Sequence, residues 1–340
     1  MKGRQICLDH IDGREAAALM VDGALHDLLI DGDAPRSGTV YRAITDRPVP
    51  GQGGIFLKTP DGAAYLRGVK GIGAGETVQV QVTGYAEPGK AIPVSHKLLF
   101  KSRYAIVTPD APGLNLSRRI RDEDIRDVLL EVAHEVMDGC EMGLILRSAA
   151  AEADRDAVAE DIAAMRELAE QVVADAGQGV DVLVQGDGPH VLAWRDWVAP
   201  AEVVTTTGCF EEYGVLDAVD AGRGAHVDLP QGASFYVEET RALVAVDVNT
   251  GTDGSFAAGL RANIACARAL PAALRVRGLG GQITLDLAPM PKKERRSFEN
   301  ALRAAFRDDD IDTVFAGWTP LGHFELQRKR ARLPLAEVLG

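Results

Sequence analysis

The sequence is poor in cysteine, and no cysteine stands in a metal-binding or redox motif. The chain has 340 residues and four cysteines, none of them in a CxxC pair. A zinc site or a thiol redox pair is therefore not expected. Sparse, unpaired cysteines are typical of proteins in a reducing compartment, so we expect a cytoplasmic location. The cysteines are Cys7, Cys140, Cys209 and Cys266.

Long apolar stretches are also missing, and negative charge outweighs positive charge. The N-terminal sequence MKGRQICLDHIDG lacks the apolar core of a signal peptide. No window approaches the roughly 18 apolar residues of a membrane-spanning helix. We therefore predict neither a signal peptide nor a membrane span. The net charge of −13 argues weakly against a nucleic-acid partner, unless the cations cluster on one face.

The N-terminal third of the chain predicts short β-strands. Residues 1–31 contain apolar runs separated by Asp-Gly pairs at 12–13 and 22–23, which are typical of two-residue hairpin turns. Short strands with frequent glycine and proline then continue for about 60 residues, the size of a small barrel such as an OB-fold.

Aromatic residues make up only 5% of the chain, yet two of them lie among cations in this barrel segment. Phe56 and Tyr65 stand near Lys58, Arg67 and Lys70. On an OB barrel, such rings stack on unpaired bases while the cations meet phosphates. The alternative is that both rings belong to the barrel core, and the sequence pattern alone does not decide between the two.

From residue 115 onward the pattern changes to helices and strands in alternation. Segment 154–177 predicts a long amphipathic helix that stops at Gly177. After residue 223 we expect three strands, a helix near 258–275, a further strand, and a helix at 292–307. This order predicts an α/β multidomain protein.

Two β-rich runs each end in a carboxylate. ALVAVDVNTG, residues 242–251, leads to Asp247 and Asn249, and GGQITLDLAPM leads to Asp286, 39 residues after Asp247. One helix between two strands is the spacing that places parallel strands side by side. Two strand-end aspartates and an asparagine form a hard oxygen site suited to Mg²⁺ or Mn²⁺. Such an ion lowers the pKa of a water it holds and stabilises charge on a phosphate.

The same residues have a purely structural interpretation. Either aspartate could cap the following helix, and Asp253 could be a turn residue. Two cationic runs in this part of the chain favour the metal site, because cations beside a metal indicate a track for phosphates. The runs contain Lys292, Lys293, Arg295 and Arg296 in the first and Arg328, Lys329, Arg330 and Arg332 in the second.

With these motifs in view, the chain resembles the bacterial RNase E/G endoribonucleases. VEETRALVAVDVNTG is similar to the strand pair with the family's first metal aspartate, and RANIACARALPAALRVRGLGGQITLDLAPM to the helix, turn and strand that carry the second. NLSRRI and MGLILRSA resemble segments that recognise an RNA 5′ monophosphate. TPLGHFELQRKRARLPL is similar to the end of the catalytic domain, so the resemblance spans about residues 40–335.

The resemblance implies an α+β fold of four parts. An S1-like OB-fold domain at 38–110 and a 5′-sensor domain at 111–177 are inserted in a split, shortened RNase H-like domain at 1–37 and 178–222. A DNase I-like catalytic domain follows at 223–340.

The resemblance also implies roles for individual residues. Asp247 and Asp286 hold one Mg²⁺ against the scissile phosphate, and Asn249 orients Asp247 or the phosphate. Arg147 and Ser148 match the Arg-Thr pair that holds the 5′ phosphate, with serine in place of threonine. The expected RNA-binding residues are Phe56, Tyr65, Lys90, Arg118, Lys292, Lys293 and Arg328.

The chain also departs from the family pattern. The cysteine pair that binds zinc and links protomers is expected just past residue 335 and is missing, so we expect no zinc link, while a homo-oligomer formed in another way stays open. The RNase H-like region is short, and the loop after Asn249 lacks its usual acidic pair. Asp312 stands where the family carries a cation that supports the 5′ pocket. We therefore expect a reduced member of the family with a weakened 5′-end preference.

The expected activity is Mg²⁺-dependent cleavage within single-stranded RNA, in RNA processing or decay, leaving 5′-phosphate and 3′-hydroxyl ends. One alternative is a catalytically weak RNA-binding protein that keeps the fold. The shortened regions favour this alternative, whereas the two aspartates and the asparagine argue against it. A metal phosphohydrolase of small substrates is a weaker alternative, because it would not need the OB-like segment or the two cationic runs.

Overall fold

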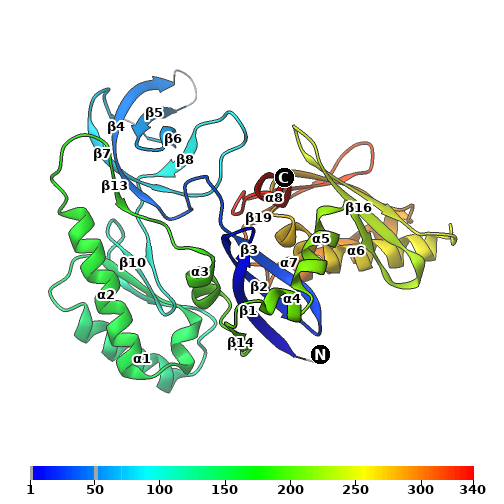
Figure 1. Ribbon diagram of the computed structural model, residues 1–340, viewed down its shortest axis with the longest axis horizontal. Helices are drawn as coiled ribbons and strands as arrows, with labels where there is room; N and C mark the ends of the chain where they lie inside the picture. Colours follow the sequence, from blue (N-terminus) through cyan, green and yellow to red (C-terminus); the bar gives the residue numbers. More distant parts are fainter. Residues whose placement is uncertain (1–2, 50–52, 70) are drawn as a thin grey trace. The chain divides into compact units, whose positions relative to one another are not determined.

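The computed structural model describes residues 3–49, 53–69 and 71–340 (Figure 1). Lys70, one of the cations near the predicted aromatic pair, lies outside the described residues. The chain forms two compact units, one of Met1–Gly32 with Pro200–Gly340 and one of Asp33–Ala199. Each unit contains two sheets. No helix in the described ranges combines the length and apolar character needed to cross a bilayer.

Five strands of the unit Asp33–Ala199 close into a barrel. They pair in the order β4-β5-β6-β8-β7, and β4 also pairs with β7. Neighbouring strands are antiparallel except β6 and β8, which are parallel. A closed five-stranded barrel is the architecture of an OB-fold, so the expected OB-like barrel is confirmed. The strands are β4 (Val40–Val49), β5 (Gly54–Thr59), β6 (Gly62–Arg67), β7 (Thr77–Val82) and β8 (Ile92–Ser95).

Alternating strand residues fill the barrel and leave the other residues of each strand outside. In β5, Ile55 and Leu57 are buried in the core, whereas the residues between and beside them point the other way. A further strand, β13 (Asp181–Val184), pairs with β4. It comes from the segment that the resemblance assigns to the RNase H-like part, and the domain boundaries themselves stay a prediction.

The second sheet of this unit has the strand order β11-β12-β10-β9 and shares one core with helices α1 and α2. Each helix begins at an aspartate, Asp122 or Asp154, whose carboxylate accepts hydrogen bonds from the first backbone N–H groups. The predicted amphipathic helix at 154–177 is thereby found as α2. The elements are β9 (Phe100–Lys101), β10 (Ala105–Thr108), β11 (Leu114–Leu116), α1 (Glu123–Val136), β12 (Gly143–Leu146), α2 (Arg155–Val173) and α3 (Pro189–Asp196).

The smaller sheet of the other unit has the order β14-β1-β2-β3. The two Asp-Gly pairs form its hairpin turns, and all four of these residues have positive φ, as a primed two-residue turn requires. Helices α4, α5 and α8 pack on this sheet. The elements are β1 (Arg4–Ile11), β2 (Arg14–Val21), β3 (Ala24–Ile30), β14 (Glu202–Val204), α4 (Cys209–Glu212), α5 (Val215–Arg223) and α8 (Leu335–Leu339).

The larger sheet of the same unit has six strands in the order β15-β16-β17-β18-β20-β19. Helix α6 links the parallel strands β17 and β18, and α6 and α7 share one apolar core with the sheet (Figure 1). Another side of α6 contacts β3, which explains why α6 is apolar over most of its surface. The elements are β15 (His226–Asp228), β16 (Ser234–Glu239), β17 (Val244–Asn249), α6 (Phe256–Val276), β18 (Gly281–Asp286), α7 (Arg295–Phe306), β19 (Thr313–Trp318) and β20 (Phe324–Arg328).

Candidate active site and RNA-binding residues

Asp247 and Asp286 occupy the same register position on two adjacent strands. β17 and β18 run parallel, and Asp247 pairs with Asp286. Val246 and Leu285 just before them are buried, so the alternation of the strands turns both carboxylates toward solvent. Neighbouring strands lie about 4.8 Å apart. The sequence expectation that the two strand-end acids come together is therefore met by the backbone geometry.

Asn249 lies on the same side of β17 as Asp247, two residues further along. Its Nδ2 donates a hydrogen bond of 3.0 Å to Oδ2 of Asp247. This bond fixes one carboxylate oxygen and leaves Oδ1 of Asp247 for another partner. The amide oxygen of Asn249 then faces away from the bond and can accept from a water or a substrate hydroxyl.

The capping interpretation of these acids is wrong. Helix α6 is capped by Ser255, whose hydroxyl accepts a hydrogen bond from the backbone N–H of Ala258. Asp253 takes the expected turn role, since its carboxylate accepts from the N–H of Ser255 at 3.0 Å. Asp286 likewise caps no helix, because the N-cap residue of the following 3₁₀ turn is Pro291 and that of α7 is Glu294. Asp247 and Asp286 thus have no capping role to explain them.

His323 is a neighbour of Asp286 that the sequence reasoning missed. Its Nδ1 lies 3.3 Å from Oδ1 of Asp286. This nitrogen is buried and has no well-aligned hydrogen bond within the described residues, although the ring is one-third exposed. A turn anchored by Thr319 places the ring there, because Oγ1 of Thr319 accepts from the N–H of His323. The sequence indicates that His323 lies near Asp286 only once β20 is known to pair with β18.

Asn263 of α6 fixes the segment that follows Asp286. Its side chain is fully buried and makes two hydrogen bonds to Ala288, donating to the carbonyl at 2.9 Å and accepting from the N–H at 3.0 Å. One turn earlier, a Cβ on Gly259 would stand 2.1 Å from the carbonyl oxygen of Pro289, so glycine is needed for this approach. The chain after the second aspartate is therefore held against α6.

Lys292 and Lys293 are exposed in a short turn of 3₁₀ helix after this segment. Neither forms an ion pair with any residue in the described ranges. Nearby, the Arg295 guanidinium lies over the Trp318 ring, 4.1 Å from its centroid. No carboxylate of the described chain neutralises the two lysines, and their expected contact with RNA phosphates stays a prediction.

The RNA-binding role expected for Arg328 is wrong. Arg328 is buried, and its guanidinium donates to the Asp309 carboxylate at 3.1 and 3.2 Å and to Oγ1 of Thr313 at 2.9 Å. Asp309 also pairs with Arg275. A guanidinium enclosed in this way has no surface to offer a phosphate, and its charge stabilises the packing of β20.

Phe56 and Tyr65 form an aromatic pair on the outside of the barrel. They are register partners on β5 and β6, with ring centroids 5.4 Å apart, and both are partly exposed. Neither belongs to the barrel core, so the core interpretation is wrong. β5 and β6 are the second and third barrel strands, whose face binds oligonucleotides in OB-folds. Arg47 lies over the Phe56 ring at 5.8 Å, and Lys58 and Arg67 are exposed on the same two strands.

Two further features belong to this outer face of the barrel. A Cβ on Gly54 would stand 2.3 Å from the Tyr65 hydroxyl oxygen and 2.5 Å from Cζ of its ring, so the glycine leaves the space that this end of the tyrosine occupies. Lys90 lies in the loop between β7 and β8, the fourth and fifth barrel strands, where it forms an exposed ion pair with Glu87. Loops at this place contribute to nucleic-acid binding in OB-folds, and an exposed pair of this kind exchanges readily with a phosphate.

Arg147 and Ser148 follow β12, and Arg118 follows the neighbouring parallel strand β11, so these residues lie at one end of the sheet. Arg118 is exposed. The Arg147 guanidinium is already engaged, because it donates to the carbonyls of Ser102 and Arg195 and to Oδ1 of Asp196 at 2.8 Å. Arg147 thus forms a salt bridge with Asp196.

Asp196 is strongly paired. Burial raises the pKa of its carboxyl, but the hydrogen bonds and charges of Arg195 and Arg147 outweigh this effect, so the pKa of Asp196 is lowered. Arg195 also pairs with Asp187 at 2.7 Å. The carboxylate of Asp196 thus occupies part of the surface with which Arg147 could bind a 5′ phosphate.

The residues around Asp247 and Asp286 fit a hard divalent cation. Both side chains offer carboxylate oxygens on one sheet edge, and Asp286 is 67% exposed. Within the described residues, no group of three or more His, Cys, Asp or Glu side chains surrounds a single ion position. Mg²⁺ commonly binds through one or two carboxylates and takes its other ligands from water and phosphate, so two carboxylates suffice.

Comparisons with known proteins identify the family of the chain. The profile of the Ribonuclease E/G family matches residues 100–201 and 199–331. Ribonuclease G of Salmonella typhimurium is 25% identical over 401 aligned residues, which cover 98% of this chain and 81% of that protein. Ribonuclease G of Escherichia coli K12 is 24% identical with the same coverage. Ribonuclease E of Synechocystis is 24% identical over 96% of this chain and 57% of its own length. The chain belongs to the Ribonuclease E/G family.

Proposed function

We propose that this chain is a Mg²⁺-dependent endoribonuclease that cleaves single-stranded RNA into products with 5′-phosphate and 3′-hydroxyl ends. The register pairing of Asp247 with Asp286, with Asn249 bonded to the first, carries this proposal. The family supports the reaction class. The proposed setting is RNA processing or decay in the cytoplasm. The proposed cofactor is Mg²⁺, with Mn²⁺ as a substitute and no zinc, and any association between copies needs no zinc link.

The side chains divide the work at the scissile phosphate. Asp247 and Asp286 hold the cation, which supplies positive charge to the phosphate and acidity to the attacking water. Asn249 keeps the Asp247 carboxylate in one orientation, and His323 restrains the Asp286 carboxylate. A carboxylate pair that is already fixed loses little entropy when it binds the cation. The cation, and the phosphate bound to it, are therefore oriented before the reaction.

RNA binding is proposed to combine the barrel and the cations near the active site. Phe56 and Tyr65 stack on unpaired bases, which are available in a single strand but not inside a duplex. Lys90 and Arg118 are proposed to bind backbone phosphates in the unit Asp33–Ala199, and Lys292 and Lys293 next to the active site. This distribution supports RNA binding by a chain whose net charge is −13.

One gel experiment tests the proposal. A labelled single-stranded RNA oligomer is incubated with wild type in Mg²⁺, in Mn²⁺ and in EDTA, and with Asp247→Asn in Mg²⁺. We expect internal cleavage by wild type with either ion and none in the other lanes. Filter binding of the same RNA is measured in parallel. If wild type binds this RNA but cuts it with neither ion, the chain is the RNA-binding alternative and the proposal fails.

A further inference from the structure

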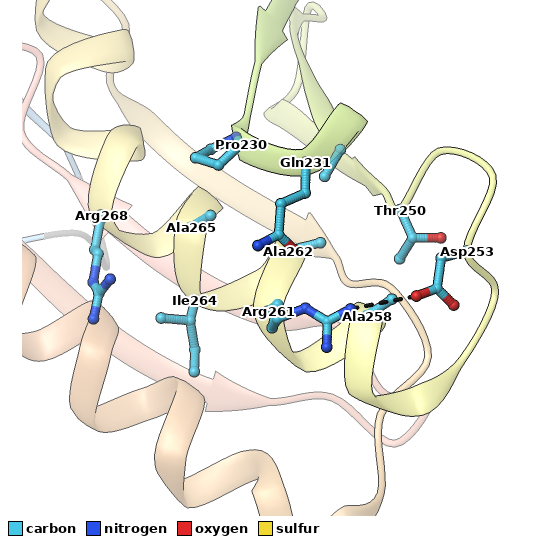
Figure 2. A pocket seen from close by; sticks show the side chains of 11 residues that line it. Pro230, Gln231, Thr250, Asp253, Ala258, Arg261, Ala262, Ile264, Ala265 and Arg268 are labelled. Atoms are coloured by element: carbon cyan, nitrogen blue, oxygen red, sulfur yellow. Dashed lines mark hydrogen bonds and ion pairs between the residues drawn. The ribbon is translucent and has the colours of Figure 1, made fainter.

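A cavity of about 350 Å³ lies between helix α6 and the turns that precede β16 and follow β17 (Figure 2). Its rim includes Thr250, which directly follows Asn249, and Gln231 from the turn before β16. The two turns that form the rim approach closely, because a Cβ on Gly251 would stand 2.4 Å from the carbonyl oxygen of Gly232. The cavity thus lies at the end of β17, on the side of the sheet that α6 covers, whereas alternation along β17 and β18 turns Asp247 and Asp286 toward the other side.

The floor of the cavity is a face of α6 made of small residues between two arginines. Ala262, Ala265 and Ile264 lie between Arg261 and Arg268, and Ala258 continues the apolar surface beyond Arg261 (Figure 2). Seven residues are almost two helical turns, so the two arginines share a face and their Cα atoms are about 10 Å apart along the axis. An apolar floor between two cations is suited to a sugar or base between two phosphates.

Arg268 is exposed and forms no ion pair with any described residue of the chain. Arg261 pairs with Asp253 at 3.3 Å, and both side chains are about half exposed. Such an exposed pair is weak and can exchange partners. The three charges sum to +1, which is a local excess of positive charge in an acidic protein. The cavity therefore attracts an anion through Arg268 and, with a partner exchange, through Arg261.

Gln231 adds a group that can recognise a base. Its backbone has φ +64°, a left-handed conformation that residues with side chains rarely adopt. The side chain extends from the turn over the alanine floor toward Ala262 (Figure 2). Its amide has both donor and acceptor atoms, which can pair with the edge of a nucleobase.

We propose that this cavity is a subsite for the RNA strand where it continues from the scissile phosphate around the end of β17, and that Arg268 and Arg261 bind backbone phosphates there while Gln231 contacts the intervening nucleotide. The inference rests on the proposed function. A volume of about 350 Å³ lies at the lower end of the range for small-ligand sites, and this size suits one nucleotide of a strand that passes through.

Binding measured in EDTA, where the RNA is not cut, tests the subsite apart from catalysis. Each phosphate contact in a single strand contributes about 0.7 to the slope of log K against log salt concentration. We expect Arg268→Ala to lower that slope by this amount and to weaken binding of a single-stranded oligomer several-fold. Arg268→Lys should keep the slope. Arg307→Ala removes one exposed arginine from the same unit and should leave the slope unchanged.

Asp253→Asn gives a change of opposite sign. The substitution keeps the oxygen that accepts from Ser255 but removes the charge that holds Arg261 and repels phosphate. We expect RNA binding to tighten several-fold, which loss of folding cannot produce. Because the three substituted positions, 253, 268 and 307, are all exposed, circular dichroism and thermal unfolding of the variants should match wild type.

Neutral methylphosphonate linkages identify the phosphate that is bound. Replacing one linkage next to the cleavage site should weaken wild-type binding as much as Arg268→Ala does, and should have no further effect in that variant. The proposal is overturned if Arg268→Ala and Asp253→Asn both bind RNA as wild type does. It is also overturned if Arg268→Ala binds the oligomer as wild type does and differs only in how well a free nucleoside monophosphate competes with the oligomer for binding. Absence of cleavage by wild type in Mg²⁺ would instead contradict the proposed function and leave these binding results valid.

Discussion

Nδ1 of His323 lies 3.3 Å from Oδ1 of Asp286. The ring belongs to the turn between β19 and β20, whereas Asp286 ends β18, so two elements far apart in the chain meet at this contact. Asn249 plays the corresponding part for Asp247 within a single strand. Each carboxylate of the candidate metal site therefore has one polar neighbour that restrains it.

His323→Ala should reduce cleavage without reducing RNA binding. Partners of metal ligands typically contribute about 10- to 100-fold to metal affinity or activity, and we expect a loss in this range. The Mg²⁺ concentration for half-maximal cleavage should rise, while KM for RNA stays near the wild-type value. His323→Asn keeps a polar side chain that can donate to Asp286 and should recover much of the activity. Equal Mg²⁺ dependence in wild type and His323→Ala would show that the ring does not position Asp286.

Asp247→Asn and Asp286→Asn should each abolish cleavage while RNA affinity and fold persist. Each substitution keeps the shape of the side chain but removes a negative ligand of the cation. Both positions are exposed, so burial gives no reason for unfolding. Cleavage rates in Mg²⁺ and dissociation constants in EDTA are measured for the same oligomer. Wild-type cleavage by either variant would mean that the cation is held elsewhere.

The strand-end acids could be predicted from the sequence because the signal is local. An apolar run that ends in Asp247 or Asp286 marks a strand end, and one helix between two strands implies that they are parallel neighbours. The same local reading could not find His323, because its place depends on β20 pairing with β18. It also could not find Asn263, whose two hydrogen bonds go to a segment 25 residues away.

For Arg328, the dense run of cations led to a wrong prediction, although the alternation of residues along the strand was the better guide. A dense cationic run indicates an exposed track, yet Phe324, Leu326 and Arg328 alternate on β20 and share its buried side. The two-residue alternation along β20 would have placed the Arg328 side chain on the buried side of the strand. Its partner Asp309 lies in the loop before β19, which no pattern in the sequence links to β20. A buried ion pair of this kind depends on tertiary structure.

Phe56→Ala should weaken binding of single-stranded RNA by roughly 1–3 kcal/mol if one base stacks on the ring. Phe56→Leu is the matched control, because it keeps apolar bulk without a π face, and it should lose nearly as much. Duplex RNA of the same sequence should bind weakly to all three proteins, since its bases are not accessible. Equal affinity of wild type and Phe56→Ala for the single strand would remove the aromatic pair from the RNA-binding surface.

The Asp196 carboxylate should stabilise its unit in a way that depends on pH. The pKa of Asp196 is lowered in the folded protein, since its pairing with Arg195 and Arg147 outweighs the effect of burial. The stabilisation is therefore present above the unfolded pKa and is lost as the pH falls through the folded pKa. Urea unfolding of wild type and Asp196→Asn is compared from neutral to acidic pH. The difference in unfolding free energy should shrink toward low pH, and a difference independent of pH would contradict this role.

We expect competition for the Arg147 guanidinium to decide whether the chain senses the RNA 5′ end. A guanidinium and a hydroxyl can bind several oxygens of a terminal monophosphate, and Arg147 with Ser148 and the exposed Arg118 lie at one end of their sheet. In the structure, however, Asp196 and two carbonyls already occupy Arg147. We therefore expect wild type to cut 5′-monophosphate RNA only a few times faster than the matched 5′-hydroxyl RNA. Arg147→Ala should erase this preference and spare cleavage of the 5′-hydroxyl RNA.

Asp196→Asn removes the competing charge and should increase the preference, provided that unfolding measurements show the variant to be folded. Rates on the two oligomers are compared for all three proteins. If wild type cuts both at one rate and Asp196→Asn does the same, Arg147 has a structural role only.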